Sequence, residues 1–460
     1  MPRRVAGVLV AFVALGFAVV GDARAARGPR HARYDVALRW HSRSYVLDGT
    51  EGVSFENTRP GTLRSVWLRL WANGVASCAH PRIKVDALSG GHAAGRAADC
   101  TALRVRLSHA LATGRRTAIR LRFSVRVPGG NGSFGHLSGG PALLGNAIPI
   151  LAVTDAAGTH LERYSTLGEA GYSLTSSWHV RLDVPRGLSA VTTGIQTASR
   201  TLSSSTRRLR FQAPHARDFE LAIGHLHTRS ATVEGVRIRF SDMLPVGTAS
   251  ARLRSEILAA ARSDLLAYEH RFGPYGAPEL DLVQTPSLDG EGMEYPEIVF
   301  VEMTPSSAYG GSWTHTAALL AHELAHQWFY SLVGNNQWRE PWLDESFATF
   351  ASGFPSHDCT NGDPLAGYPS SLRLTSDMGY FDAHPSGWYY DGLYGGGACA
   401  LRDLRTGFGT QRFNDFMRSW VAAHRYRVAT TAAFLSAVRA AAPSGFDVDG
   451  WRRDSRIDVR

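Results

Sequence analysis

Hydrophobic and polar side chains alternate along the first half of the chain, from about residue 34 to residue 223. The alternation is clearest at residues 34–40, 119–127 and 180–184, where every second side chain is apolar. A period of two places the apolar side chains on one face of a strand, so these segments predict half-buried antiparallel β-strands. The glycine-rich stretch at 129–140 is predicted to be a mobile loop. We therefore expect an all-β domain here.

After about residue 226 the period becomes that of an α-helix. Apolar residues recur every four positions at Leu253, Ile257, Ala261 and Leu265, and Gly273 marks the expected end of that helix. Short strands are expected at 279–283 and 298–301, and further helices at 316–332, 343–351, 395–406, 411–424 and 431–442. The prediction is an α+β multidomain protein with an N-terminal antiparallel β domain at 26–225 and an α-rich domain with a small sheet at 226–460.

The N-terminus has the layout of a secretory signal. Arg3 and Arg4 precede an apolar stretch at 5–20, and Ala23-Arg24-Ala25 supplies the small residues of a cleavage site. The apolar stretch is shorter than the roughly 20 residues that cross a bilayer. We expect a signal peptide at 1–25, no stable membrane insertion after cleavage, and a secreted or cell-envelope location.

Cysteine count and charge refine this picture. Four cysteines in an exported chain permit two disulfides, and sequence proximity favours Cys78–Cys100 and Cys359–Cys399 among three connectivities. The net charge is +9, but the arginines are scattered and no run of five basic residues occurs. A solvated surface explains this charge, so we expect no nucleic-acid partner. The sequence leaves the oligomeric state open.

A candidate catalytic site is indicated by the motif His322-Glu323-Leu324-Ala325-His326, which lies in a predicted helix without proline or glycine. Residues four apart project from the same helix face, so His322 and His326 can bind one tetrahedral metal ion. Glu323 lies between them and can act as the general base on a metal-bound water. Such a site needs a third protein ligand and one open position.

Glu345 is the candidate third ligand. It follows His326 after eighteen intervening residues, at the start of the next predicted helix. That spacing allows the first helix to end near Gly334, turn through Asn335 and Asn336, and bring a carboxylate back from an antiparallel neighbour. Two histidines and one carboxylate favour zinc, one ion per chain.

Two further motifs belong to the prediction. Tyr389, Tyr390 and Tyr394 precede a predicted helix, and any of them could donate a hydrogen bond to an oxyanion; spacing alone does not choose among them, and a packed aromatic cluster is the alternative. Upstream, Gly292-Met293-Glu294-Tyr295-Pro296 carries an isolated carboxylate. Glu294 either pairs with the free α-ammonium of a peptide or is a solvated residue in a turn.

Together these residues resemble the gluzincin aminopeptidases of peptidase family M1, the aminopeptidase N and leukotriene hydrolase type. The likeness rests on His322, Glu323, His326 and Glu345, on Gly292-Met293-Glu294, which resembles that family's G-x-M-E-N motif, and on Tyr394 with the glycines after it. The resemblance implies a thermolysin-like zincin catalytic domain, zinc on His322, His326 and Glu345, Glu323 as base, Tyr394 at the oxyanion, and Gly292, Met293 and Glu294 binding peptide substrates with a free N-terminus.

The sequence departs from the family pattern at three places. Around the third ligand the chain has Leu343-Asp344-Glu345-Ser346 where the family usually has Leu-Asn-Glu-Gly, and Tyr295 stands where asparagine is usual. The chain stops at Arg460, so the resemblance is to a short form without a helical C-terminal domain. The expected function is an exported zinc aminopeptidase. The alternatives are a zinc endopeptidase on the same scaffold and a catalytically silent peptide-binding relative.

Overall fold

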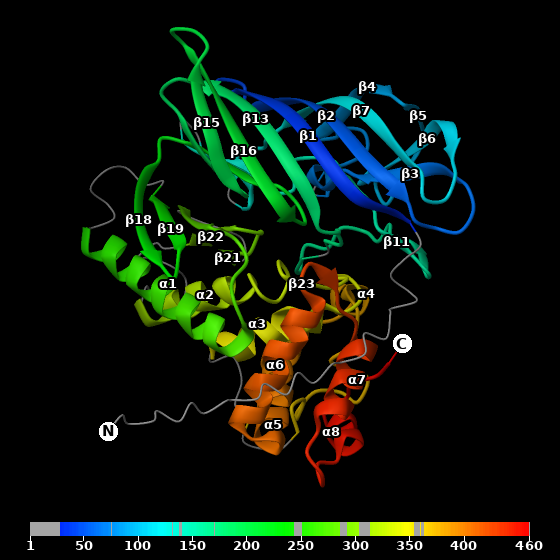
Figure 1. Cartoon of the computed structure of the whole chain (residues 1–460), viewed down its shortest axis with the longest axis vertical. Helices are drawn as coiled ribbons and strands as arrows, with labels where there is room; N and C mark the ends of the chain where they lie inside the picture. Colours follow the sequence, from blue (N-terminus) through cyan, green and yellow to red (C-terminus); the bar gives the residue numbers. More distant parts are fainter. Residues whose placement is uncertain are drawn as a thin grey trace, which may run out of the picture.

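The computed structural model describes residues 28–459 except 75, 131, 138–139, 170, 243–250, 286–291, 303–312, 354–358 and 360–362. The predicted signal peptide therefore lies outside the described residues. Figure 1 shows two lobes, a β domain coloured blue to green and a second lobe in which most of the helices gather. In the part of the chain that is described, no helix is both long and apolar enough to cross a membrane.

Three sheets build most of the β domain. The largest has the order β15 (Ile195–Thr201), β16 (Thr206–Ala216), β13 (Ser176–Pro185), β1 (Pro29–His41), β2 (Val46–Asn57), β7 (Arg116–Arg126) and β4 (Ile83–Ser89). A four-stranded sheet has the order β10 (Ile150–Leu151), β3 (Leu63–Arg69), β6 (Ala102–Leu111) and β5 (Gly91–Ala97). The third has the order β14 (Ser189–Thr192), β17 (Leu221–Gly224), β9 (Ala142–Leu144) and β8 (Phe134–His136).

The alternation in the sequence becomes the division between core and surface. Along β1 the residues Tyr34, Val36, Leu38 and Trp40 are buried in one core with Trp178 and Phe211. The predicted pairing is wrong at one place, because β1 runs parallel to β13 and stacks Tyr34 on Trp178 with ring centroids 4.0 Å apart. More than a hundred residues separate the two strands, so no hairpin fixes their relative direction.

Two further predictions concern local features of the sequence. The glycine-rich stretch predicted as a mobile loop contains the short strand β8, which pairs with β9. A period of two cannot reveal a strand of three residues. Both predicted disulfides, Cys78–Cys100 and Cys359–Cys399, are present.

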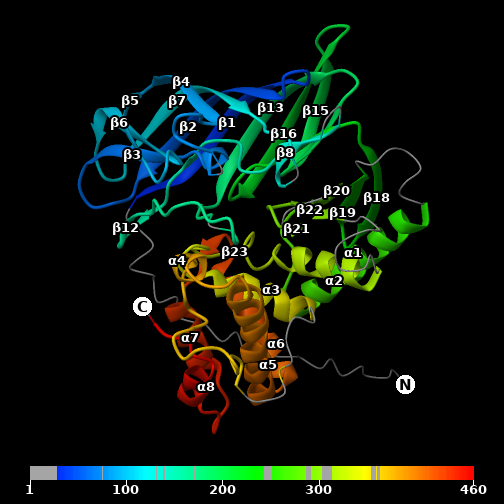
Figure 2. The ribbon, with the colours of Figure 1, turned by 180° about the vertical axis from the view of Figure 1, so that it is seen from behind.

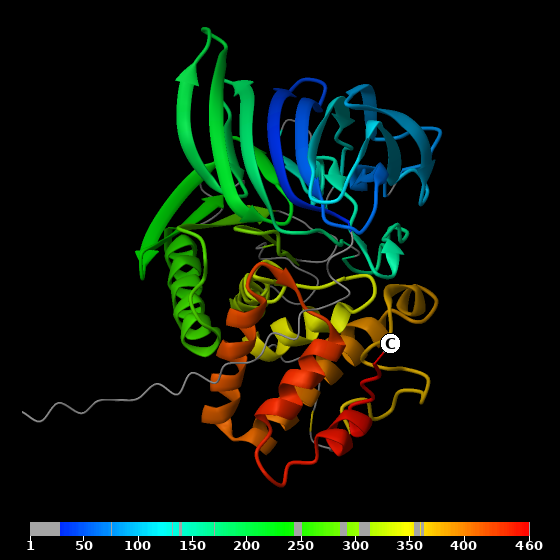
Figure 3. The same ribbon diagram turned by 45° about the vertical axis from the view of Figure 1, so that its right-hand side comes forward.

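The second lobe contains a five-stranded sheet and the helices. The sheet order is β18 (His227–Val233), β19 (Val236–Asp242), β20 (Glu279–Thr285), β22 (Ile298–Glu302) and β21 (Gly292–Met293). The helices of this lobe are α1 (Ala251–Phe272), α2 (Trp313–Ala325), α3 (Glu345–Ser352), α4 (Met378–Asp382), α5 (Gly397–Phe408), α6 (Thr410–His424), α7 (Thr431–Ala441) and α8 (Val448–Asp454). The lobe also has the 3-10 turn η2 (Pro341–Leu343) and a π-helical segment η3 (Trp388–Gly396), whereas the 3-10 turn η1 (Trp71–Asn73) belongs to the β domain. Figure 3 shows α5 to α8, orange to red, on the side of α2 and α3 away from the largest sheet.

The predicted helix at 316–332 is wrong in its C-terminal half, because α2 ends at Ala325. The chain beyond it forms turns, and Tyr330 has a positive φ of 140°. The short strand β23 (Val333–Gly334) then pairs in parallel with β24 (Arg427–Val428). These contacts come from residues almost a hundred positions away, so local helix preference does not extend α2 through Leu332.

Contacts between the lobes include a small apolar core and a buried guanidinium. A small core packs Leu143, Val191 and Ala222 of the β domain together with Val283 and Phe300 of the five-stranded sheet.

The second contact is the guanidinium of Arg217, which is buried at the junction. It donates to the carbonyl oxygens of Ser173 at 2.9 Å, Tyr330 at 2.6 Å and Arg427 at 2.7 Å. A Cβ on Gly334 would lie 1.9 Å from its central carbon, which explains a glycine at that position. Figure 2 shows the junction from behind, with the β11–β12 hairpin beside it.

Candidate active site

His322 and His326 come from the C-terminal end of α2 and the turn that follows. The backbone N–H of His326 still donates to the carbonyl of His322 at 3.4 Å, so the spacing of a helical turn persists beyond the helix. The two rings lie edge to face with centroids 4.8 Å apart, and their Nε2 atoms are 3.1 Å apart. Both imidazoles are buried. The predicted juxtaposition of the two histidines is therefore present.

Glu345 is the first residue of α3 and completes the group. The side chain of Asp344 caps α3 by accepting a hydrogen bond from the N–H of Glu345. The Oε2 of Glu345 lies 3.3 Å from the Nε2 of each histidine. These three side chains form a group that could hold a metal ion, with ligand atoms within 4.8 Å of one another. Two imidazoles and a carboxylate are the donor set that zinc accepts, with a fourth position left for water.

The electrostatics of this group suit a cation. Burial alone would raise the pKa of the Glu345 carboxyl, but the neighbouring His326 and His322 hold it well below its usual value. On the other side of its ring, the Nδ1 of His326 lies 3.0 Å from the carbonyl of Phe329. A proton on Nδ1 donates to that carbonyl and leaves Nε2 with a lone pair toward the group.

Glu323 packs against the strand that carries the second motif. A Cβ on Gly292 would lie 2.1 Å from the Oε1 of Glu323, so only glycine allows this approach of β21 to α2. Burial and the neighbouring Glu294 raise the pKa of the Glu323 carboxyl well above its usual value. The sequence assigned Gly292 to the substrate edge, and the structure gives it a second task, making room for Glu323.

Gly292 and Met293 form β21, which pairs with β22, and Glu294 follows directly. Glu294 is buried, and the amide of Gln337 donates to its Oε1 at 3.4 Å. Burial is the main cause that raises the pKa of Glu294 to about 7. The alternative of a solvated residue in a turn is therefore wrong. Three residues after Glu294, the N–H of Glu297 donates to the side chain of Gln327, which fixes this segment against the turn after α2.

Of the three tyrosines, only Tyr394 stacks on a histidine of the group. Its ring lies 5.6 Å from that of His322 with an interplanar angle of 11°. Tyr390 is exposed and donates to the carbonyl of Leu167 at 2.9 Å, and Tyr389 is fully buried.

Ser346 explains one departure from the family pattern. Its hydroxyl donates to the carbonyl of Leu393 at 2.7 Å, one residue before Tyr394. A Cβ on Gly397 would lie 1.9 Å from this hydroxyl. The serine after the third candidate ligand therefore links α3 to the segment η3 that carries the tyrosine.

Glu169 is the residue that the sequence reasoning missed. It comes from an irregular loop of the β domain, yet it forms a second group with Glu294 and Glu345 whose oxygens lie within 4.8 Å of one another. Its Oε2 is buried with no hydrogen-bond partner among the described residues. Burial and the carboxylates of Glu294 and Glu345 raise its pKa well above the usual value. No pattern in the sequence around Glu169 could have signalled this position.

Comparison with known proteins agrees with this arrangement. A family model described as the Peptidase family M1 domain matches residues 258–366, a range that contains the motif at 292–296, both histidines and Glu345. This part of the chain is therefore similar to the peptidase family M1 domain. It is 31% identical over 189 residues to the tricorn protease-interacting factor F2 of Thermoplasma acidophilum, covering 37% of this chain and 24% of that protein. It is 27% identical over 226 residues to aminopeptidase M1-A of Oryza sativa subsp. japonica, covering 45% and 25%.

The chain thus matches only about a quarter of the length of these curated relatives. Solved structures cover almost all of it. An M1 zinc metallopeptidase from Deinococcus radiodurans has a TM-score of 0.68 at 21% identity, with 94% of this chain and 95% of that chain covered. A mutant of an M1 zinc metallopeptidase from the same organism, bound to a Tyr-Ser-Ala substrate, has a TM-score of 0.67 at 19% identity, with 95% and 96% covered. The chain therefore shares the fold of these solved structures over both lobes.

Proposed function

We propose that this protein is a zinc-dependent aminopeptidase that releases N-terminal residues from peptides. The observation that carries the proposal is the presence of two further buried carboxylates, Glu169 and Glu294, beside the His322, His326 and Glu345 group. A metal group alone fits any metallopeptidase. Two extra carboxylates at one edge of it form a pocket for a positive charge, and the α-ammonium is the charge that only a free N-terminus supplies.

The unfavourable electrostatics of two buried carboxyl groups side by side support an ammonium ligand. Burial and neighbouring negative charges both disfavour the ionised form of a carboxyl group. Burial and the nearby Glu345 raise the pKa of Glu294 to about 7, and burial with Glu294 and Glu345 raises the pKa of Glu169 well above its usual value. A cation bound between the two carboxylates relieves the repulsion and restores their ionised forms. A zinc endopeptidase, the alternative, has no need of this pair, because an internal peptide segment carries no ammonium.

The candidate ligands fit zinc, and the relatives include M1 zinc metallopeptidases. When bound, zinc lowers the pKa of a water molecule and polarises a peptide carbonyl. His322, His326 and Glu345 would hold it. The hydrogen bond from the Nδ1 of His326 to Phe329 keeps that imidazole in the orientation a ligand needs.

Glu323 and Tyr394 supply the remaining chemistry. Glu323 accepts a proton from the attacking water and later delivers it to the leaving amine, and its raised pKa suits a group that must do both. The hydroxyl of Tyr394, whose ring is fixed against His322, donates to the oxyanion that develops on the carbonyl oxygen. Gly292 and Met293 form β21, the strand along which the backbone of the peptide substrate would lie.

Paired substrates test this proposal. Aminoacyl fluorogenic substrates are compared with their N-acetylated forms, using the wild type, Glu294→Gln and Glu169→Gln. We expect hydrolysis of the free-amine substrates only, and a rise in KM of about tenfold or more for each variant, because each removes one charge partner of the ammonium. Equal hydrolysis of the N-acetylated substrates would favour the endopeptidase, and no hydrolysis of any peptide by metal-loaded protein would favour the silent relative.

We also propose that the protein is exported. The apolar stretch at 5–20 followed by Ala23-Arg24-Ala25 supports this, and so do the two disulfides, which persist in oxidising compartments. The full chain is expressed in a bacterial host with an intact export system, and the N-terminus of the extracytoplasmic protein is sequenced. The expected new N-terminus is Ala26. Retention of the full-length chain in the cytoplasm would contradict the proposal.

A further inference from the structure

Glu169 reaches the site on a loop that leaves one lobe and lies against the other. This crossing loop, described at residues 160–169 and 171–175, follows the hairpin of β11 (Thr154–Asp155) and β12 (Gly158–Thr159) and leads into β13. Halfway along, the hydroxyl of Ser165 donates to Asp382 at 2.6 Å, and the carbonyl of Leu167 accepts from Tyr390 at 2.9 Å.

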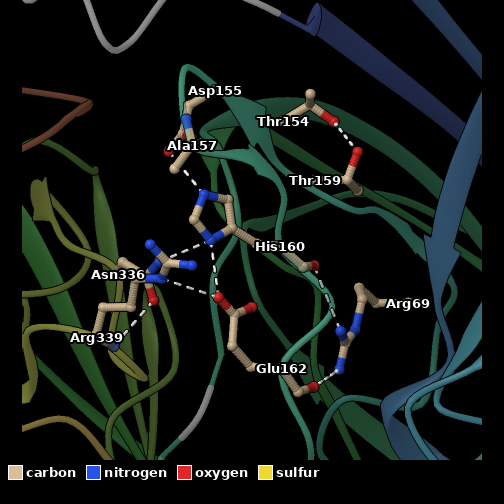
Figure 4. Close-up of polar contacts among 9 residues, drawn as sticks. All are labelled: Arg69, Thr154, Asp155, Ala157, Thr159, His160, Glu162, Asn336 and Arg339. Carbon is tan, nitrogen blue, oxygen red and sulfur yellow. Dashed lines mark hydrogen bonds and ion pairs between the residues drawn. The ribbon is translucent and has the colours of Figure 1, made fainter.

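The loop begins at a buried histidine held between two carboxylates. The Nε2 of His160 lies 2.7 Å from Asp155 and its Nδ1 lies 2.9 Å from Glu162. The His160 side chain is 3% exposed, and the ring of Tyr172 meets it edge to face at 4.9 Å. Figure 4 shows the imidazole between the two acids, with Asn336 and Arg339 beside it.

Asn336 and Arg339 belong to the other lobe. The side-chain amide of Asn336 lies 3.1 Å from the Nδ1 of His160, and the Nε of Arg339 donates to Glu162 at 3.2 Å. These residues lie in the segment between the turn after α2 and Glu345. The cluster at His160 therefore fixes the start of the crossing loop to the stretch of chain that leads from the second candidate metal ligand to the third.

The crossing loop brings Glu169 into a site that already holds two other acids. Glu169 lies beside Glu294 and Glu345, with carboxyl oxygens of the three residues within 4.8 Å of one another, so its position has to be fixed by contacts elsewhere in the loop. On the far side of Glu169, the carbonyl of Ser173 accepts a hydrogen bond from Arg217 at 2.9 Å, and the ring of Tyr172 meets His160. The crossing loop is therefore fixed at both ends and near its middle, and these contacts keep the carboxyl group of Glu169 in the site.

We propose that His160 is a positioning residue for substrate binding: it holds Glu162 toward Arg339 of the other lobe, so that the crossing loop keeps Glu169 at the ammonium pocket. This inference rests on the proposed aminopeptidase function. It assigns His160 an effect on the binding of the free amine and none on the chemical step, because the imidazole contacts neither the candidate metal group nor Glu323 among the described residues.

A double-mutant cycle tests the inference. His160→Gln and Glu169→Gln are each expected to raise KM for a free-amine substrate about tenfold with kcat within about twofold. The KM of the double variant is expected to equal that of Glu169→Gln alone, because displacing the loop has no further effect once the carboxylate of residue 169 has been replaced. If the two effects multiply, or if His160→Gln lowers kcat at unchanged KM, His160 acts on stability alone and the inference is wrong.

Two further variants keep the test decisive. His41→Gln removes an exposed histidine that pairs with Asp48 at 2.9 Å in the same domain, and it is expected to change neither constant. Arg339→Gln removes the charge that pairs with Glu162 from the opposite lobe, and it is expected to raise KM about threefold, even if His160→Gln does not fold. An unchanged KM in Arg339→Gln would count against the inference.

Hydrogen exchange separates this inference from the proposed function. In the metal-loaded protein without substrate, peptides from 163–174 are expected to exchange at least about tenfold faster in His160→Gln, while those from β1 and β2 are unchanged. If the wild type hydrolyses no aminoacyl substrate but this exchange pattern appears, the aminopeptidase proposal fails and the positioning of the loop stands. Unchanged exchange in 163–174 would overturn the role of His160.

Discussion

Glu51 is a single buried side chain that is expected to lower the stability of the β domain. It lies on the inward face of β2, 2% exposed, and neither carboxyl oxygen has a hydrogen-bond partner among the described residues. Burial raises its pKa well above the usual value of 4.5, so the folded protein holds it protonated. A carboxyl group that stays protonated only in the folded state makes stability depend on pH.

We predict that Glu51→Gln stabilises the protein above about pH 5. Below pH 4.5 both the folded and the unfolded chain keep the proton. As the pH rises above 4.5, only the unfolded chain ionises, so the wild type loses stability until the pH reaches the raised folded pKa. Urea unfolding at pH 4 and pH 8 should show a gain of about 1–3 kcal/mol at pH 8 and little at pH 4. An equal effect at both pH values would contradict this.

A second residue-scale prediction concerns Gly292. A Cβ there would lie 2.1 Å from Glu323, so Gly292→Ala must displace the proposed base. We expect kcat to fall by about a hundredfold, since general bases contribute roughly 10²–10⁴-fold and depend on position. Gly52→Ala is the control, because a Cβ at that glycine meets nothing closer than 3.9 Å. Steady-state kinetics with one aminoacyl substrate measures both. An unaffected kcat in Gly292→Ala would mean that Glu323 is not the base.

At the scale of elements, the β11–β12 hairpin depends on the protonation of His160. Burial lowers the pKa of that imidazole, but the hydrogen bonds to Asp155 and Glu162 outweigh burial and raise the pKa to about 9. Arg339, which donates to Glu162, is the cation that faces the cluster from the other lobe. The imidazolium therefore links the two lobes at neutral pH.

This link predicts an alkaline loss of stability. The contribution of His160 is fully present below its unfolded pKa of about 6.5 and disappears as the pH rises through about 9. The difference of about two and a half pKa units corresponds to up to about 3 kcal/mol. Denaturant midpoints measured at pH 6, 8 and 10 should fall more steeply for the wild type than for His160→Gln. Parallel curves would show that His160 is neutral in the folded protein.

Elements also reveal where local patterns fail. The helix that carries His322 was predicted to continue to residue 332 because its sequence favours helix, but pairing of β23 with β24 and the bonds of Arg217 end it at Ala325. The helices at α1, α6 and α7 agree closely with their predictions. Those helices have apolar faces that pack on one core, so their sequence period and their tertiary contacts demand the same structure.

For the whole molecule, the metal is expected to contribute to stability as well as to activity. An ion that binds the folded chain alone stabilises it by RT ln(1 + [L]/Kd), about 4 kcal/mol at a thousandfold excess over Kd. Chelation should therefore abolish hydrolysis and lower the thermal midpoint, and added zinc should restore both. Glu345→Gln, which removes one candidate ligand, should shift much less on chelation. A thermal midpoint of the wild type that does not change on chelation would contradict the metal site.

The sequence by itself determined which residues could carry the chemistry. The spacing of His322, Glu323 and His326 is local, and helical geometry converts it directly into two imidazoles on one face. The alternation of apolar residues likewise determined the β domain, because each strand must bury one face. Glu345 was accessible to the same reasoning, since a short connection limits how far the next helix can lie.

Only the tertiary structure decided how the two lobes complete the site. Glu169 and His160 lie in an irregular loop without a motif, and their positions depend on contacts with residues that are more than a hundred positions away. The choice of Tyr394 over its neighbours depends on stacking against His322. Contacts between distant segments follow from packing and charge across the whole fold, and no spacing within one segment records them.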